Sequence, residues 1–339
     1  MTPDMPPPDP RLAALLDWLS TVLGRPVENF EPISTDASFR RYFRVRHGDG
    51  TWIAMDAPAP REKVGPFLKV AALLRQAGVQ TPEIHAADPE RGFVLLGDLG
   101  ASSYLDRLDP ATADRLYGDA LAALLRLQTG VEPATAGLPV YGAALLGAEL
   151  DIFREWFLER LLGLEVSTAE AGLLEETWRR LIDSALEQPR VCVHRDYHSR
   201  NLMVTERGNP GVLDFQDAVV GPIAYDAVSL LRDCYIAWPA QQVRAWLDGY
   251  RDGLRDAGLL DSTGAENFRR WFDLMGLQRH LKAIGIFARL KLRDGKPAYL
   301  KHIPRTFGYL VEVGRTYPEF AGFLEFLEAK IQPRLAEVG

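Results

Sequence analysis

Residues 191–204, which read VCVHRDYHSRNLMV, place polar side chains at the edges of short apolar runs. Asp196 closely follows the apolar residues 191–193, and Asn201 directly precedes the apolar residues 202–204. Asp214 follows another apolar run in the sequence GVLDFQD. Because such runs are typical of short buried strands, each polar residue is expected near a strand end. We predict a hairpin that brings Asn201 and Asp214 together, with Asp196 on the loop beside them.

This set of side chains suits phosphoryl transfer. The oxygens of Asn201 and Asp214 are hard ligands of the kind that Mg2+ prefers when it carries nucleotide phosphates. Asp196 could then accept the proton of an attacking hydroxyl group. Taken singly, an Asp or Asn at a strand end is more often a turn residue or a cap. The combination HRDxxxxN, an apolar strand and LDF matches kinase catalytic and metal-binding signatures in type, spacing and order, which favours catalysis.

The stretch HRDYHSRNLMV, followed by GVLDFQDAVVGPIAYDAVSLL, resembles the aminoglycoside phosphotransferase/choline kinase branch of the protein-kinase-like fold. The resemblance implies an α+β, two-lobed fold with a small β-rich N-lobe and a larger, mostly helical C-lobe. It implies that Asp196 is the catalytic base and that Asn201 and Asp214 bind Mg2+. It also implies that Asp226 is a structural residue, which ties its helix to the catalytic loop.

Two residues of the same motif have less definite roles. For His194 we favour bracing of the loop. Arg195 is left open between bracing and a part in catalysis. A protein kinase is disfavoured, because Asp214-Phe215-Gln216 replaces D-F-G and no A-P-E segment follows.

Segments outside the motif resemble a narrower family. STDASFRRYFRV, VLLGDLG and QRHLKAIGIFARLKLRDGKPAYLKHIPR are similar to the bacterial anomeric kinases that act on N-acetylmuramate and N-acetylglucosamine in cell-wall recycling. The resemblance extends from about residue 12 to residue 304. It implies transfer of the γ-phosphate of ATP to the C1 hydroxyl of an N-acetylated amino sugar, with Mg2+ as cofactor.

The nucleotide side departs from the kinase pattern. The hairpin that should cover the phosphates reads TDASFRRY and lacks GxGxxG. The backbone of Ser38 and the side chains of Arg40 and Arg41 could hold phosphates instead, although a pair of surface arginines without a ligand is an equal alternative. Met55 stands where the phosphate-binding lysine is expected, so one of these arginines or Lys63 replaces it, or the strand register differs.

The segment between the lobes is expected to bind adenine. By analogy with the fold, the backbone of Gly97 and Leu99 would bond the base, with Leu96 beside the ring. Gly97 and Gly100 could also be ordinary turn glycines, which is compatible with adenine binding by this segment.

A sugar site needs polar groups for hydroxyls and an aromatic platform. For Trp156 and Trp238 a role in the core is favoured over one in the site. Asp217 could bind a hydroxyl or a second metal ion, and Arg289 or Arg293 could meet the lactyl carboxylate of a muramic sugar. The candidates for substrate binding are Trp156, Gln216, Asp217, Trp238 and Arg289.

The spacing of apolar residues predicts the elements that would position these groups. We predict a tail over residues 1–10, an N-lobe over 11–98 and a C-lobe over 99–339. The N-lobe should contain a β-hairpin around residues 39–55 and two strands flanking the turn DPERG. Helices are expected over residues 10–24, 64–79, 105–127, 148–163 and 169–188, and over most of the chain after residue 224.

Composition narrows the class further. The 339 residues carry a formal net charge of −7, which disfavours broad binding to nucleic acids. Neither a leader peptide nor a run of about 18 apolar residues is recognisable, so we expect a cytoplasmic protein with no membrane contact and no obligate protein partner. Two alternatives stay open: a kinase for an aminoglycoside, choline or a similar amine, and a nucleotide-binding module without turnover.

Overall fold

The computed structural model describes residues 9–27, 29–34, 39–48, 50–60, 62–260 and 264–337. The chain divides into two compact units. The first unit consists of the chain up to Ala72 together with Thr81–Gly100. The second unit consists of Leu73–Gln80 together with the chain from Ala101 onward. The α+β fold class predicted from the sequence is confirmed, because the first unit is built on an antiparallel sheet and the second is mostly helical.

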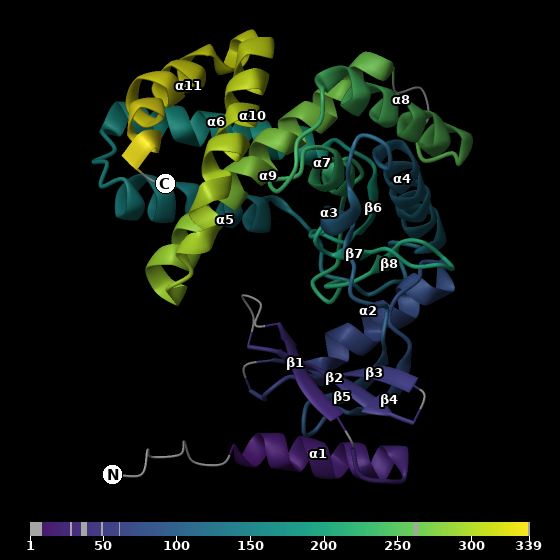
Figure 1. Cartoon of the computed structure of the whole chain (residues 1–339). Helices are drawn as coiled ribbons and strands as arrows, with labels where there is room; N and C mark the ends of the chain where they lie inside the picture. The colour runs from purple at the N-terminus through teal and green to yellow at the C-terminus, as the bar shows by residue number, and fades with distance from the viewer. Residues whose placement is uncertain are drawn as a thin grey trace, which may run out of the picture. The chain divides into compact units, whose positions relative to one another are not determined.

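The first unit packs one helix against a five-stranded antiparallel sheet (Figure 1). Asp9 caps helix α1 by accepting hydrogen bonds from the backbone of Arg11 and Leu12. The helix ends at Gly24, whose φ of 73° is a conformation that favours glycine. The helix buries Leu15, Trp18 and Leu19 against Phe43, Val45, Ala54, Phe93 and Leu95 of the sheet.

The strand order in this sheet is β1-β2-β3-β5-β4. The predicted hairpin is confirmed by the pairing of β2 with β3, in which Arg41 lies opposite Asp56. Strand β1 was not predicted as a separate strand. It contains Pro32, which cannot donate to a strand ladder and is tolerated at the edge position that β1 occupies. The elements of the first unit are α1 (Pro10–Leu23), β1 (Asn29–Ser34), β2 (Arg41–His47), β3 (Gly50–Asp56), β4 (Ile84–Asp88), β5 (Phe93–Gly97) and the start of α2 (Val64–Gln76).

Short strands of the second unit frame the predicted catalytic segment. β6 (Arg190–Val193) pairs with β9 (Val219–Pro222), and β7 (Leu202–Met203) pairs with β8 (Gly211–Val212), both antiparallel. The second pair is the hairpin that was predicted around residues 202–212.

The rest of the second unit is helical, and several of its helices pack on the long helix α9 (Ala265–Asp294) (Figure 1). Helices α5, α6, α7 and α10 and the π-helical segment η1 all pack on α9. Gly285 allows a close crossing, because a Cβ atom there would lie 2.6 Å from the carbonyl carbon of Ile152. The helical elements are α3 (Tyr104–Arg107), α4 (Ala113–Gly130), α5 (Ala143–Ile152), η1 (Phe153–Leu161), α6 (Thr168–Leu186), α7 (Tyr225–Leu231), α8 (Ala240–Asp256), α9 (Ala265–Asp294), η2 (Pro297–His302), α10 (Ile303–Thr316), η3 (Pro318–Phe320), α11 (Ala321–Phe326), η4 (Leu327–Ile331) and η5 (Gln332–Glu337).

Within the described part of the chain, every helix is too short or too polar to cross a bilayer.

Candidate active site

The β7–β8 hairpin brings the predicted metal ligands together. Leu202 pairs with Val212, and the backbone N–H of Leu213 donates to the carbonyl oxygen of Asn201 at 2.9 Å. Asp214, the next residue, therefore lies beside Asn201. The side-chain nitrogen of Asn201 donates to the backbone carbonyl of Asp196 at 3.0 Å, which adds the predicted base to the same neighbourhood.

This arrangement also suits a metal ion. The side-chain amide nitrogen of Asn201 donates to the backbone of Asp196, so the side-chain amide oxygen can bind a cation. The exposed carboxylate of Asp214 lies next to it. In the described residues no group of three or more His, Cys, Asp and Glu side chains could hold a metal, so a cation here would need further ligands such as phosphate oxygens.

The backbone is strained at the two ends of this segment. Arg195 has a φ of 77° and Asp214 a φ of 60°, and no other non-glycine residue that the structure describes has a positive φ. Such a conformation costs on the order of 1–3 kcal/mol and persists only where surrounding bonds impose it. Arg195 directly precedes Asp196, and Asp214 is itself one of the predicted metal ligands.

His194 and Asp226 supply the bonds that hold the loop. The backbone N–H groups of His194 and Arg195 donate to the two carboxylate oxygens of Asp226 at 2.7 and 3.0 Å. Asp226 is fully buried, and burial raises its pKa to about 6.

The imidazole of His194 bridges the loop to the strand end before Asp214. Its Nε2 lies 2.9 Å from the carbonyl oxygen of Leu213, and its Nδ1 lies 3.2 Å from the backbone nitrogen of Asp196. The carbonyl can only accept and the backbone N–H can only donate, so the ring carries its proton on Nε2. Burial lowers the pKa of His194, which keeps this neutral form at physiological pH. The geometry is that of a brace.

The carboxylate of Asp196 is available to a ligand. No side-chain or backbone donor in the described chain bonds to its oxygens, and it lines a cavity of about 100 Å³ in the second unit. Burial alone would raise the pKa of Asp196, but neighbouring positive groups, with Lys282 the strongest, leave that pKa below its ordinary value. The group is therefore ionised at neutral pH and can accept a proton.

The cavity has a polar and an apolar side. Tyr235, Ile286 and Phe287 form an apolar wall. The polar lining consists of Arg195, Asp196, His198, Tyr225, Arg279 and Lys282.

A buried glutamate organises part of the polar side. Glu149 forms ion pairs with the guanidinium of Arg195 and, at 2.9 Å, with the ammonium of Lys282. The Lys282 ammonium also donates to the hydroxyl of Tyr225 at 3.1 Å. Burial would raise the pKa of Glu149, but Lys282 and then Arg195 hold it below its usual value. Arg195 is thus held at its backbone by Asp226 and at its side chain by Glu149.

Glu149, Lys282 and Arg279 were not identified from the sequence. For Lys282 and Arg279, the surrounding sequence does contain an indication. Lys282 and Arg279 lie within the mostly apolar run around residues 277–290. Positively charged residues in such a run are rarely buried without a partner or a role.

The substrate-binding candidates chosen from the sequence lie outside the lining of this cavity. The side chain of Gln216 donates to Asp214 at 2.8 Å and, weakly, to Asp217 at 3.5 Å, so both belong to the neighbourhood of the candidate metal ligands. Trp238 donates to the hydroxyl of Tyr117 at 2.8 Å. Trp156 packs on the helical core beneath the guanidinium of Arg160, and Arg289 is half-buried on α9. None of these candidates lines the described cavity at Asp196.

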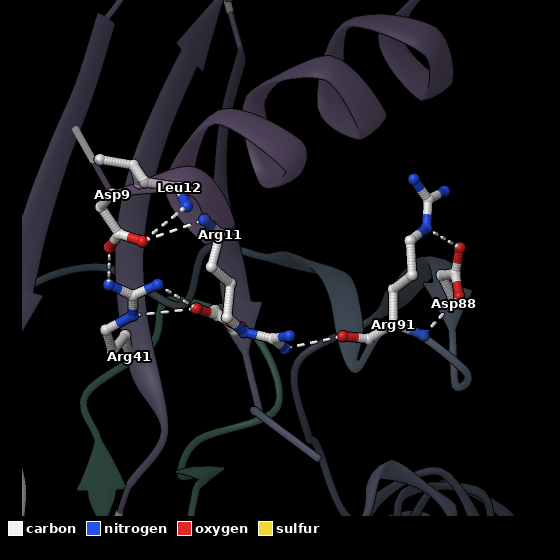
Figure 2. A network of polar contacts seen from close by, with 7 residues as sticks. Asp9, Arg11, Leu12, Arg41, Asp88 and Arg91 are labelled. Carbon is white, nitrogen blue, oxygen red and sulfur yellow. Dashed lines mark hydrogen bonds and ion pairs between the residues drawn. The ribbon is translucent and has the colours of Figure 1, made fainter.

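The arginines chosen for the phosphates have acidic partners in the first unit. Arg40 is buried and pairs with Glu62 at 2.9 Å. Arg41 pairs with the fully buried Asp56 at 2.5 Å and with Asp9. Figure 2 shows Arg41 bound to Asp9, together with Arg11, whose guanidinium also donates to the backbone oxygen of Arg91. Ser38, the third candidate, lies outside the described residues.

The neighbouring strand offers no cation at the expected position. Met55 is fully buried in β3, opposite Val94 of β5. Lys63 forms no ion pair with any residue that the structure describes.

The candidate adenine-binding residues differ from one another in backbone bonding. The N–H of Gly97 already donates to the carbonyl of Glu83 at 2.7 Å. Leu96 is buried in the sheet opposite Ile53. The backbone of Leu99 forms no hydrogen bond within the described chain.

The fold and the Asp, Asn and Asp at these strand ends are of the kind that phosphotransferases have, and comparison with known proteins shows that class. The model of the phosphotransferase enzyme family matches residues 29–260. This chain belongs to that family.

Individual proteins give a closer match. The chain is 46% identical over 333 residues to the N-acetylmuramate/N-acetylglucosamine kinase of Pseudomonas putida, an alignment that covers 95% of this chain and 97% of that protein. Among solved structures it resembles the aminoglycoside phosphotransferase APH(2'')-Ib in its ADP-bound form, with a TM-score of 0.62 and 14% identity over 89% of this chain and 98% of that one. Choline kinase LicA from Streptococcus pneumoniae gives a TM-score of 0.60 and 12% identity over 90% of this chain and all of that one. At such low identity the two structures support the fold alone.

Proposed function

We propose that the protein is an ATP-dependent kinase that phosphorylates the C1 hydroxyl of N-acetylmuramate and N-acetylglucosamine. The observation that carries this proposal is the ionised, donor-free carboxylate of Asp196, which lines a cavity and whose backbone carbonyl accepts a hydrogen bond from the side chain of Asn201. The identity to the P. putida kinase supplies the choice of sugars.

Asp196 is the residue assigned to proton transfer. It accepts the proton of the C1 hydroxyl while the new bond forms between that oxygen and the γ-phosphorus of ATP. The bond from the γ-phosphorus to its bridging oxygen breaks, and ADP leaves. The anomeric hydroxyl is more acidic than an ordinary alcohol, so a carboxylate is a sufficient base.

Asn201 and Asp214 are assigned to hold Mg2+, which supplies neutralisation of the phosphate charge when bound. His194 and Asp226 hold the loop that carries Asp196, through the bonds described above. This division matches phosphoryl transfer, in which the protein contributes chiefly position and electrostatics.

The charge of the cavity disfavours the alternative acceptors. Arg195, Arg279 and Lys282 line it, whereas choline and aminoglycosides are cations that need acidic or aromatic surroundings. A module without turnover would have no use for an ionised base with an open face.

The test is an acceptor panel. ADP release is measured with ATP and Mg2+ in the presence of N-acetylmuramate, N-acetylglucosamine, glucose, choline or kanamycin. Turnover of the two N-acetyl sugars alone is expected. Turnover of choline or kanamycin instead would keep the phosphotransferase and discard the sugars, and nucleotide binding without turnover would favour the module.

A further inference from the structure

Arg279 is a buried cation that has no acidic partner among the described residues. It lies on α9, is 7% exposed and lines the cavity that also contains Asp196. Its one hydrogen bond within the described chain is a weak contact of 3.7 Å from Nη1 to the sulfur of Cys234. No carboxylate in the described chain lies within ion-pair distance of its guanidinium. Because a guanidinium stays charged at any physiological pH, an unpaired one is costly to bury.

The acidic side chains closest to Arg279 form hydrogen bonds or ion pairs with other residues. Asp233 accepts hydrogen bonds from the backbone N–H groups of Ser199 and Tyr235, at 2.9 and 2.8 Å. Glu149 is shared by Arg195 and Lys282. Asp196 has to remain open for the acceptor hydroxyl if it is the base. Arg279 is therefore the one polar cation of the cavity lining, within the described chain, whose charge no carboxylate neutralises at close range.

The two sugars named for the P. putida relative differ by one anionic group. N-acetylmuramate is N-acetylglucosamine with a lactyl ether on O3, which ends in a carboxylate. A guanidinium can meet a carboxylate with two parallel hydrogen bonds.

We propose that Arg279 binds the lactyl carboxylate of N-acetylmuramate and sets the preference between the two sugars. The inference rests on the proposed function and adds a specificity residue to it. With N-acetylglucosamine the guanidinium keeps water in place of the carboxylate, so the same cavity accepts both sugars. The residues considered from the sequence fit less well, because Arg289 is not in the cavity lining and Arg293 is exposed and paired with Asp294 at 2.8 Å.

The first test compares the two sugars. For Arg279→Met, kcat/KM with N-acetylmuramate should fall by about 10–100-fold, the loss of a charge-assisted hydrogen bond, and with N-acetylglucosamine by far less. Arg279→Lys should recover part of the loss for N-acetylmuramate. Lys291→Met removes a positive charge from an exposed position of the same helix and serves as the control. Equal losses for both sugars, or none, would overturn the proposal.

The second test changes the sugar and leaves the wild-type protein intact, so it does not depend on a variant that folds. Replacing the lactyl carboxylate of N-acetylmuramate with a carboxamide should raise KM by about the same 10–100-fold. For Arg279→Met, the KM values for N-acetylmuramate and its carboxamide should be the same.

A calorimetric measurement separates this proposal from the function itself. If wild-type protein phosphorylates neither sugar, the proposed function fails. N-acetylmuramate should still bind more tightly than N-acetylglucosamine if Arg279 is its carboxylate site. Equal binding, or binding of neither sugar, would overturn the assignment of Arg279.

Discussion

The cations of the predicted phosphate hairpin in the first unit and the cations of the cavity in the second unit differ in how many carboxylates surround them. In the first unit Arg40, Arg41 and Arg44 each pair with a carboxylate, at 2.9 Å to Glu62, 2.5 Å to Asp56 and 2.7 Å to Asp98. In the second unit Arg195 and Lys282 share one glutamate, and Arg279 forms no ion pair with any carboxylate that the structure describes.

The difference shows what residue type alone can predict. An arginine beside an expected phosphate site is a structural residue when the fold supplies an acid for it. A buried cation with no carboxylate at close range keeps its charge for a ligand. The number of acids that the fold places around each cation is therefore a better guide to function than its position along the chain.

The largest effect is expected at Asp196. Asp196→Asn removes the proton acceptor and should lower kcat by about 10²–10⁴-fold with little change in the unfolding transition. Steady-state kinetics with N-acetylmuramate measures it, and Asp183→Asn, an exposed carboxylate on α6, is the matched control. A variant that retains most of the wild-type kcat would move the base to another residue.

The second prediction concerns the placement of the cavity cations. Gly285→Ala would push α9 away from the end of α5, because its Cβ would lie 2.6 Å from a backbone atom of Ile152. Since α5 carries Glu149, the pair with Lys282 should weaken. We expect a loss of about 3 kcal/mol in the free energy of unfolding, measured in urea, together with a lower kcat/KM. Gly249→Ala, at an open position of α8, should show neither change.

The third prediction is a pH dependence at Asp226. Its pKa is raised from 3.8 to about 6 in the folded protein, so protonation favours folding. The stability from this group is complete below pH 3.8 and is lost as the pH rises through about 6, by about 3 kcal/mol in total.

Asp226→Asn should remove that dependence. The free energy of unfolding of the wild type relative to Asp226→Asn is expected to decrease between pH 4 and pH 7. This difference isolates Asp226 from the histidines that titrate over the same range. If this difference in the free energy of unfolding does not change with pH, burial does not raise the pKa of Asp226.

The smallest effect is expected at Arg41. Arg41→Met leaves the buried Asp56 with Arg11 as a remaining partner, at 2.6 Å. We expect the free energy of unfolding to fall by about 1.5 kcal/mol and the KM for ATP to change by less than about threefold. A tenfold rise in that KM would instead favour the sequence-based prediction that Arg41 holds phosphates, and the contrast between the two units would not hold.

The sequence predicted best what is encoded over a short stretch. Asp196, Asn201 and Asp214 lie within one short stretch of the sequence, at the ends of the consecutive strands β6, β7 and β8, so the pattern predicted that they come together. The hairpin of β2 and β3 and the helix that ends at Gly24 were predicted for the same reason.

The cavity could not be predicted in this way. Glu149 and Lys282 are far apart in the sequence, and only the crossing of α5 and α9 joins them. No spacing rule connects such residues, so the sequence identified cations but not the acids that decide their roles.

Phosphorus NMR of the product tests the central claim most directly. Wild-type protein is incubated with ATP, Mg2+ and N-acetylmuramate, and the coupling of the new phosphorus signal to the sugar protons locates the phosphate. The account predicts coupling to the proton on C1, with no such product from Asp196→Asn. A phosphate on another hydroxyl, or the same 1-phosphate formed at an undiminished rate by Asp196→Asn, would contradict it.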